Sequence, residues 1–206
     1  MILDNGITGK VRKKLGNMVG ANWKNKNYVR SYVQPAYTNT AAQIVQRNLF
    51  KGVVGWAVGI VGQVLNVYLD PFCRKMSAYN YIVKKNITYF TAVPEWNNTK
   101  ICYGKLYPPQ ITDVSYVSNT GVCTIPFSTN LGANGKSDDK IMAACYISSI
   151  GRWYFAVAPV NRSVGSIVVT VATGQTGANI QCYAFAAQYV KTILKMVSNS
   201  IHANAS

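Results

Sequence analysis

The stretch Gly9–Phe50, GKVRKKLGNMVGANWKNKNYVRSYVQPAYTNTAAQIVQRNLF, is the most distinctive part of this chain. It combines glycines, two groups of basic residues, one tryptophan and the start of a helix. The glycines at 9, 16 and 20 separate short segments, and the alternation in Tyr28–Val33 is typical of a strand. We therefore predict two or three short antiparallel strands between residues 10 and 33, with a hairpin turn at Asn25-Lys26-Asn27.

A helix is predicted to begin at about Ala41. Thr38-Asn39-Thr40 precedes it, and side-chain oxygens at such positions accept hydrogen bonds from the free amides of the first turn. The apolar spacing of Val54, Val58, Val61, Leu65 and Tyr68 fits one helix face. Glycines at 52, 55 and 59 each cost about 1 kcal/mol relative to alanine, so the sequence leaves open whether this helix is continuous.

A second helix is predicted over residues 72–86, after Asp70-Pro71, because proline is favoured in the first turn of a helix. The two helices would form a hairpin whose apolar faces pack together.

Beyond residue 98 the pattern changes to short strands separated by turn residues about every 8–12 positions. The predicted strands are 100–106, 111–117, 121–127, 140–148, 153–159, 166–171 and 179–188, with 189–199 as a further candidate. This rhythm is typical of an immunoglobulin-like antiparallel β-sandwich. The predicted fold class is therefore α+β, with a basic hairpin and helical hairpin domain at 1–98 and a β-sandwich domain at 99–206.

The charge of the chain is strongly positive and uneven. The net charge is +15, and residues 1–100 carry 14 Lys and Arg against Asp4, Asp70 and Glu95. This asymmetry favours a polyanionic neighbour, such as nucleic acid, an acidic protein face or a membrane surface, although a charge that serves solubility explains it as well. The only membrane candidate, Gly52–Leu69, is short and contains polar residues, so no membrane span is expected. The first residues lack the apolar segment of a secretory signal.

The five cysteines are Cys73, Cys102, Cys123, Cys145 and Cys182. They form no C-x-x-C pair, and His202 is the only histidine, so no metal site and no cofactor are expected. Buried, reduced thiols are the preferred interpretation, and they indicate a reducing compartment.

No catalytic motif is recognisable in the chain. The six carboxylates are scattered, and His202 lies in a small polar tail that is expected to be frayed. Asp138 and Asp139 could hold a cation, but at a loop-to-strand junction they more often cap a turn. Gly16–Gly20 lacks the spacing of a phosphate-binding loop. The chain is therefore not expected to be an enzyme.

The best candidate contact surface is basic. It comprises Lys10, Arg12, Lys13, Lys14, Lys24, Lys26 and Arg30. On a β-ribbon, Lys10, Arg12 and Lys14 share a face that could follow a phosphate backbone, while Trp23 or Tyr28 could stack on bases. The alternative is a solvated face, with Trp23 as a core anchor for the helical hairpin.

Short motifs occur along nearly the whole sequence: Gly9-Lys10, Gly16-Asn17-Met18-Val19-Gly20, Trp23-Lys24, Tyr28-Val29-Arg30, Asn39-Thr40, Gln43, Gln46-Arg47-Asn48, Phe50, Met76-Ser77, Tyr79-Asn80, Asp138-Asp139-Lys140, Arg162, Gly165-Ser166 and Val197-Ser198-Asn199-Ser200. Through these residues the chain resembles an uncharacterised family of Bacteroidetes-type bacteria and their phages. The chain departs from the family pattern at Asn25, where glycine is usual, and in its additional Arg12, Lys13 and Lys14. The family has no assigned activity. The resemblance implies a phage or prophage setting and a virion role more than an enzymatic one.

We therefore expect a non-enzymatic virion structural or accessory protein, capsid or tail associated and made in the host cytoplasm. It would act through contacts with other virion proteins as a homo- or hetero-oligomer. The first alternative is an intracellular nucleic-acid-binding protein that uses the basic hairpin. A second alternative is a sandwich that binds carbohydrate or another surface through exposed Trp153 and Tyr154.

Overall fold

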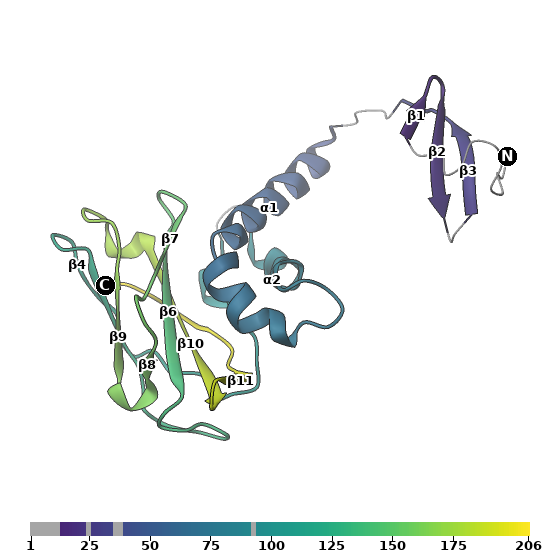
Figure 1. Ribbon diagram of the computed structural model, residues 1–206. Coiled ribbons are helices and arrows are strands. Elements are labelled where there is room, and N and C mark those ends of the chain that lie inside the picture. The colour runs from purple at the N-terminus through teal and green to yellow at the C-terminus, as the bar shows by residue number, and fades with distance from the viewer. Residues whose placement is uncertain (1–12, 24–25, 35–38, 92–93) are drawn as a thin grey trace. The chain divides into compact units, whose positions relative to one another are not determined.

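The computed structural model (Figure 1) describes residues 13–23, 26–34, 39–91 and 94–206. Only the backbone is described for Lys13, Leu15, Asn22, Trp23, Lys26 and Asn27. The chain divides into two compact units, Met1–Ala41 and Ala42–Ser206. The predicted domain boundary between residues 98 and 99 thus falls inside the second unit.

The first unit is a three-stranded antiparallel sheet in the order β1-β2-β3. Its strands are β1 (Lys13–Leu15), β2 (Met18–Trp23) and β3 (Lys26–Ser31). Gly16 and Asn17 join the first two strands, and Gly16 has a φ of +58°, which glycine adopts without steric cost. The prediction of short antiparallel strands in this region is confirmed for the described residues.

The predicted turn at residues 25–27 is wrong for two of its three members. Lys26 pairs with Trp23 and Asn27 pairs with Asn22, so both belong to β3. The longer β2–β3 ladder satisfies backbone N–H and C=O groups that a wider turn would leave hydrogen-bonded to water.

The second unit begins with the helical segment. Helix α1 (Ala41–Val58) starts at the predicted residue, runs through Gly52 and Gly55, and ends at a turn at Gly59 and Ile60. The chain continues as a π-helix, η1 (Val61–Leu69), and the two parts are bent by 81°. The buried residues of α1 are Val53, Trp56 and Ala57, so Val58, predicted on the apolar face, lies off the buried side and is 58% exposed.

Within the described residues, no single helix has the length and apolar character needed to cross a membrane. Only the bent pair Ala41–Val58 and Val61–Phe72, taken together, meets that test.

The second helix is shorter than predicted. Asp70–Phe72 forms a 3-10 turn, η2, residues 73–77 are not helical, and α2 spans Ala78–Asn86. Ser77 caps α2, because its Oγ accepts a 3.3 Å hydrogen bond from the amide of Asn80. The capped helix therefore begins at Ala78, six residues after Phe72, where the sequence predicts the second helix to begin. Four further 3-10 turns are η3 (Ile87–Tyr89), η4 (Trp96–Asn98), η5 (Arg162–Val164) and η6 (Gly177–Asn179).

Two antiparallel sheets form the rest of the unit, which makes the fold α+β. The six-stranded sheet has two long central strands, β6 (Lys140–Ile147) and β10 (Ile180–Val190). Strands β7 (Arg152–Phe155) and β8 (Val160–Asn161) pair with β6, and β11 (Ile193–Val197) and β12 (Ile201–Asn204) pair with β10. The three-stranded sheet is β4 (Ser115–Val117), β5 (Val122–Pro126) and β9 (Ser166–Thr170), in that order.

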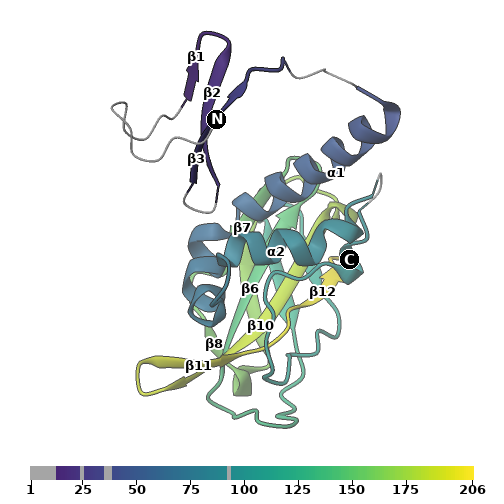
Figure 2. The same ribbon diagram turned by 90° about the vertical axis from the view of Figure 1, so that its right-hand side faces the viewer.

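The six-stranded sheet is the middle layer of three. Alternate residues of β6 and β10 enter two separate cores. The core on the side of the three-stranded sheet contains Ile141, Ala143, Cys145, Ile147, Ile180, Cys182, Ala184 and Ala186. The core on the side of the helices contains Met142, Ala144, Tyr183, Phe185 and Ala187. Figure 2 shows α1 and α2 over the face of the sheet that β6 and β10 form. Because both faces are covered, these strands are almost continuously apolar.

Two predictions about the β region are wrong. Residues 100–106 do not form a strand, because side chains take their backbone amides: Lys100 N donates to Asn86 Oδ1 at 2.8 Å, and Ile101 N to Ser200 Oγ at 2.9 Å. The tail around His202 is not frayed, since it forms β12 and pairs with β10. The remaining predicted strands are present, although 111–117 is reduced to β4 and 153–159 to β7.

Two tryptophans join the helices to the sheet. The rings of Trp56 in α1 and Trp153 in β7 are 5.5 Å apart, and Trp153 Nε1 donates a 2.8 Å hydrogen bond to the carbonyl of Trp56. Trp153 is only 8% exposed. The alternative in which an exposed Trp153 binds carbohydrate is therefore wrong, because this ring packs inside the unit.

Asp138 and Asp139 have different environments at the start of β6. Asp138 is exposed and Asp139 is buried. Asp139 Oδ2 accepts the amide of Lys136 at 2.8 Å, and its Oδ1 accepts Gln188 Nε2 at 3.0 Å. Asp139 thus caps the turn that leads into β6, as the preferred interpretation of the sequence has it.

Arg162 is fully buried beside Asp139, with 3.8 Å between Nε and Oδ2. Its Nη1 donates to the carbonyl of Asn130 at 3.1 Å, and its Nη2 to that of Tyr107 at 2.6 Å. The guanidinium therefore ties two loops to the edge of the sheet. Burial lowers the pKa of Arg162 from its ordinary value.

Two glycines of the first helical segment provide a matched test of this packing. A Cβ at Gly59 would lie 2.3 Å from Trp153 Cδ1, whereas one at Gly55 would meet no atom within 4 Å. We predict that Gly59→Ala lowers the free energy of unfolding by about 1–3 kcal/mol through overpacking. Gly55→Ala is expected to raise it by up to about 1 kcal/mol through helix propensity. Urea denaturation measures both, and equal effects of the two variants would contradict the packing at Trp153.

The ion pair gives a second prediction. Arg162→Ala leaves the buried Asp139 carboxylate without its cation and is expected to cost about 3–5 kcal/mol of unfolding free energy. Asp138→Asn changes the exposed neighbour and is expected to stay within about 0.5 kcal/mol of the parent. Thermal and urea unfolding of both variants make the comparison, and an Arg162→Ala protein as stable as Asp138→Asn would refute the role of the pair.

Candidate functional site

The structure places four of the seven predicted contact residues on the first sheet. Lys13 and Lys14 lie in β1, and Lys26 and Arg30 lie in β3. The Lys14 and Arg30 side chains are exposed, and only the backbone is described for Lys13 and Lys26. Lys10, Arg12 and Lys24 lie outside the described residues, so their part in the site stays a prediction.

Strand register brings Lys14 and Arg30 onto one face of this sheet. Lys14 pairs with Val19 in β2, and Val19 pairs with Arg30 in β3. Residues directly opposite each other in an antiparallel ladder point to the same side. The two cations therefore stand in one row across three strands, about 10 Å apart at the backbone.

Two tyrosines share that face. Tyr28 lies two positions before Arg30 on β3, so strand alternation puts both on one side, and Tyr32 lies one position beyond the end of β3. Lys14 Nζ lies 3.8 Å from the centre of the Tyr32 ring. The face thus combines cations with aromatic rings, which is the chemistry that binds a phosphate backbone and stacks on bases. A structural interpretation of the Lys14–Tyr32 contact is a surface cation–π pair, worth about 0.5–1 kcal/mol.

Trp23 occupies the last position of β2, paired with Lys26. Because its side chain is not among those described, its roles as a stacking platform or as a core anchor both stay predictions.

The second unit contains an open groove of about 650 Å³ beside α1. Its residues come from α1, from the segment that leads to η4, and from the end of β6: Val45, Asn48, Leu49, Gly52, Phe90, Thr91, Pro94, Trp96, Tyr146 and Ser148. Its volume and its mixture of aromatic rings with a few amide and hydroxyl groups match those of small-ligand sites. The groove could not be predicted from the sequence, because its residues are spread over about a hundred positions without a motif.

His202 is fixed between two amides. Its Nε2 is 2.8 Å from Gln181 Oε1, and its Nδ1 is 2.8 Å from Asn97 Oδ1. Gln181 Nε2 already donates to Ala178 O, so Gln181 Oε1 faces the ring and accepts the Nε2–H of the imidazole. Burial lowers the pKa of His202 to about 4, which keeps the ring neutral at physiological pH.

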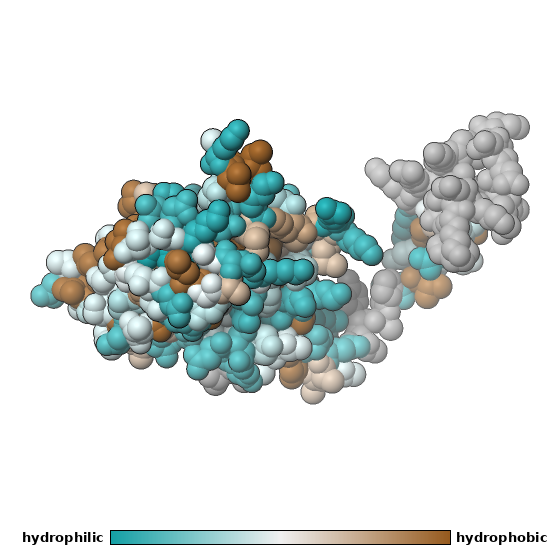
Figure 3. Space-filling view, turned by 90° about the horizontal axis from the view of Figure 1, so that it is seen from below, coloured by the Kyte–Doolittle hydropathy of each residue, from teal (hydrophilic) through white to brown (hydrophobic). Residues whose placement is uncertain are grey.

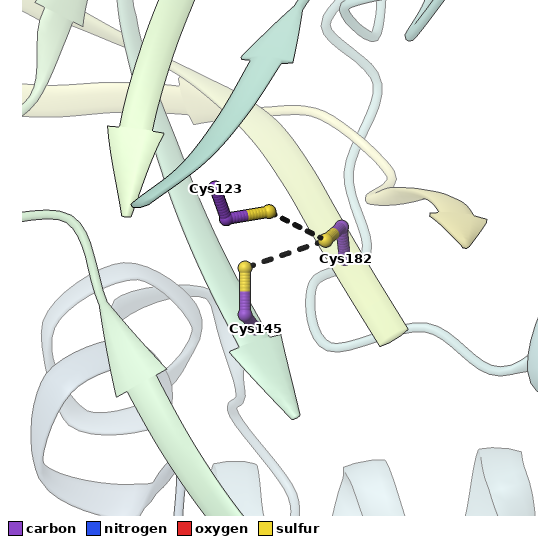
Figure 4. Close-up of side chains that lie close together, drawn as sticks. All are labelled: Cys123, Cys145 and Cys182. Atoms are coloured by element: carbon purple, nitrogen blue, oxygen red, sulfur yellow. Dashed lines mark hydrogen bonds between the residues drawn. The ribbon is translucent and has the colours of Figure 1, made fainter. Parts of the chain in front are cut away.

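Three of the five cysteines converge in the core between the two sheets (Figure 4). Cys182 Sγ is 3.5 Å from Cys123 Sγ and 3.4 Å from Cys145 Sγ, and all three sulfur atoms lie within 4.8 Å of one another. Burial raises the pKa of the Cys145 thiol well above its ordinary value. The prediction of buried, reduced thiols is confirmed for these three residues, which are unpaired and inaccessible. Their convergence was not predicted, because strand pairing rather than sequence spacing creates it.

The surface in Figure 3 is mainly hydrophilic, with apolar residues in small groups. Three apolar side chains of α1 are about half exposed to solvent: Ile44 at 45%, Val45 at 57% and Phe50 at 52%. Ile44 and Val45 lie in the first two turns of α1, where every residue from 41 to 48 is exposed.

Comparison with known proteins gives one positive result. No functionally curated protein and no solved structure matches the chain significantly. A protein-family match covers residues 9–203, which is nearly the whole sequence and includes both units. The chain therefore belongs to DUF6266, a family of unknown function.

Proposed function

We propose that this protein is a non-enzymatic structural or accessory component of a phage-type virion, associated with the capsid or tail and made in the bacterial host cytoplasm. It acts through protein–protein contacts with other virion proteins, as a homo- or hetero-oligomer. The phage setting comes from the sequence resemblance, and the observation that carries the contact role is the exposed start of α1.

The start of α1 has the chemistry of a surface that another subunit covers. Ile44 and Val45 are about half exposed, and they lie beside a groove that includes the aromatic rings of Phe90 and Trp96. Covering apolar surface is worth about 25 cal/mol per Å². Exposed apolar side chains that border a groove are a common feature of interaction sites.

Two side chains that could do chemistry have structural tasks here. His202 is neutral and held by two amides, and Asp139 is bonded within the Arg162 network. General acid–base catalysis needs a titrating group that can reach a substrate. These two residues favour a protein that works by contact.

We also propose that the two packed sheets of the second unit are an immunoglobulin-like sandwich. Support comes from the antiparallel pairing in both sheets and from the core that residues of β5, β6, β9 and β10 share. Such sandwiches are common in proteins that assemble through their surfaces.

The virion role predicts that the protein co-purifies with particles. Particles are isolated on a density gradient from a lysed producing culture, and mass spectrometry measures this chain relative to the major capsid protein. We expect a fixed ratio across gradient fractions and at least a tenfold loss of incorporation for the double variant Ile44→Glu, Val45→Glu. Both positions are exposed, so the variant is expected to fold.

The matched control is Val164→Glu, in the turn before β9, where the side chain is 59% exposed. It is expected to incorporate normally. A protein abundant in the lysate but absent from particles would refute the virion role, and equal losses for both variants would refute the contact at α1.

The second candidate function is nucleic-acid binding by the first sheet. The specific observation in its favour is the row that contains Lys14 and Arg30, flanked by Tyr28 and Tyr32 on the same face. The unit Met1–Ala41 also carries seven Lys and Arg against Asp4.

This candidate predicts binding to duplex DNA that weakens steeply with salt. In fluorescence anisotropy, the double variant Lys14→Ala, Arg30→Ala is expected to reduce the slope of log K against log salt by about 2. The control Lys84→Ala, Lys85→Ala removes the same charge from exposed positions of α2 and is expected to leave the slope unchanged. Undetectable binding at 50 mM salt, or equal effects of the two double variants, would remove this candidate.

A further inference from the structure

The three converging cysteines come from three strands of two different sheets. Cys145 and Cys182 are directly paired across β6 and β10, so both thiols point to the same side of the middle layer. Cys123 lies in β5, the central strand of the opposite sheet, and all three residues are fully buried. The sulfur atoms therefore form a triangle between the sheets, with two edges of 3.4 and 3.5 Å and no edge longer than 4.8 Å.

This triangle has the size of a metal–sulfur site. A metal–thiolate bond of about 2.3 Å places three sulfur atoms around one ion about 4 Å apart. Two of the observed separations, 3.4 and 3.5 Å, are about half an ångström shorter than that value, and the third is at most 4.8 Å, so the three sulfur atoms are spaced closely enough to share one ion.

We infer that Cys123, Cys145 and Cys182 form a three-sulfur site for Cu(I). Soft thiolate ligands select Cu(I), zinc or iron–sulfur clusters. Structural zinc takes four ligands, and among the described residues the group around this point contains three cysteines and no His, Asp or Glu. Cu(I) accepts three sulfur ligands without a fourth. With two of the cysteines as thiolates and the third as a neutral thiol, the site carries a single net negative charge, which costs less in a closed apolar core than the two charges of three thiolates.

Binding of Cu(I) to these cysteines requires no oxidant or reductant. Copper remains Cu(I), Cu–S bonds form at all three cysteines, two S–H bonds break, and the two displaced protons pass to solvent. Affinity is therefore expected to rise with pH, because each thiolate ligand must lose a proton. Since the sulfur atoms are inaccessible in the folded chain, the ion enters as the chain folds.

The test is refolding of the reduced, denatured chain with Cu(I) under anaerobic conditions, followed by competition with the chelator bicinchoninate. We expect one copper per chain to be retained and the thermal midpoint to rise relative to the copper-free protein. Cys145→Ala is expected to lower retention at least tenfold. Cys102→Ala removes a thiol that is equally buried but outside the triangle, and it is expected to retain one copper.

X-ray absorption of the unmodified protein gives a readout that does not depend on any variant. Three sulfur neighbours at about 2.2–2.3 Å support the site. Fewer than three sulfur neighbours, retention that depends on Cys102 as much as on Cys145, or no retained copper would overturn the inference. Preferential retention of zinc with a nitrogen or oxygen fourth ligand would overturn the assignment to Cu(I).

Discussion

The second unit depends on one constraint: the central strands β6 and β10 must be covered on both faces. Their alternate residues belong to two different hydrophobic cores, so neither the helices nor the smaller sheet can be removed without exposing apolar residues. An antiparallel sheet usually has one face in water, and covering both is characteristic of parallel sheets. Here a helical layer takes the place that solvent has in an ordinary sandwich.

The helices therefore pack mainly against the sheet and less against each other. Trp56 lies within ring-contact distance of Phe90, Trp153 and Tyr183, which come from the helical segment, β7 and β10. Tyr183 Oη and Thr99 Oγ1 are 2.6 Å apart, which satisfies the one polar group of a ring that is otherwise enclosed. This aromatic junction joins the helices to β7 and β10, and all of its residues belong to the unit Ala42–Ser206.

Local signals in the sequence predicted the positions of helices and strands well, but they did not predict which distant segments these helices and strands contact. The start of α1 at Ala41 and the bounds of β5, β6 and β9 followed from turn residues and alternation, which are properties of neighbouring positions. The irregular segment 100–106 and strand β12 depend on distant groups, namely Ser200 and β10. The same limit applies to the sites. The basic residues of the first unit are close together in sequence, so the sequence predicts a basic surface there. Strand alternation further predicts that Lys14 shares a face with Lys10 and Arg12. The cysteine triangle and the groove beside α1 are assembled by the fold from separate segments, so spacing along the chain carries no sign of them.

The order in which the middle layer is synthesised has a consequence for production of the protein. Strand β6 ends at Ile147 and its main partner β10 begins at Ile180. At ribosomal rates of about 5–20 residues per second, roughly 2–7 s pass before β10 exists. During that time β6, apolar on both sides, has only the short strands β7 and β8 and the helical segment to shield it. Slow, long-range pairing of this kind exposes a nascent chain to aggregation. The yield of soluble protein in a recombinant host is therefore expected to depend on chaperone capacity and growth temperature as well as on the stability of the finished fold.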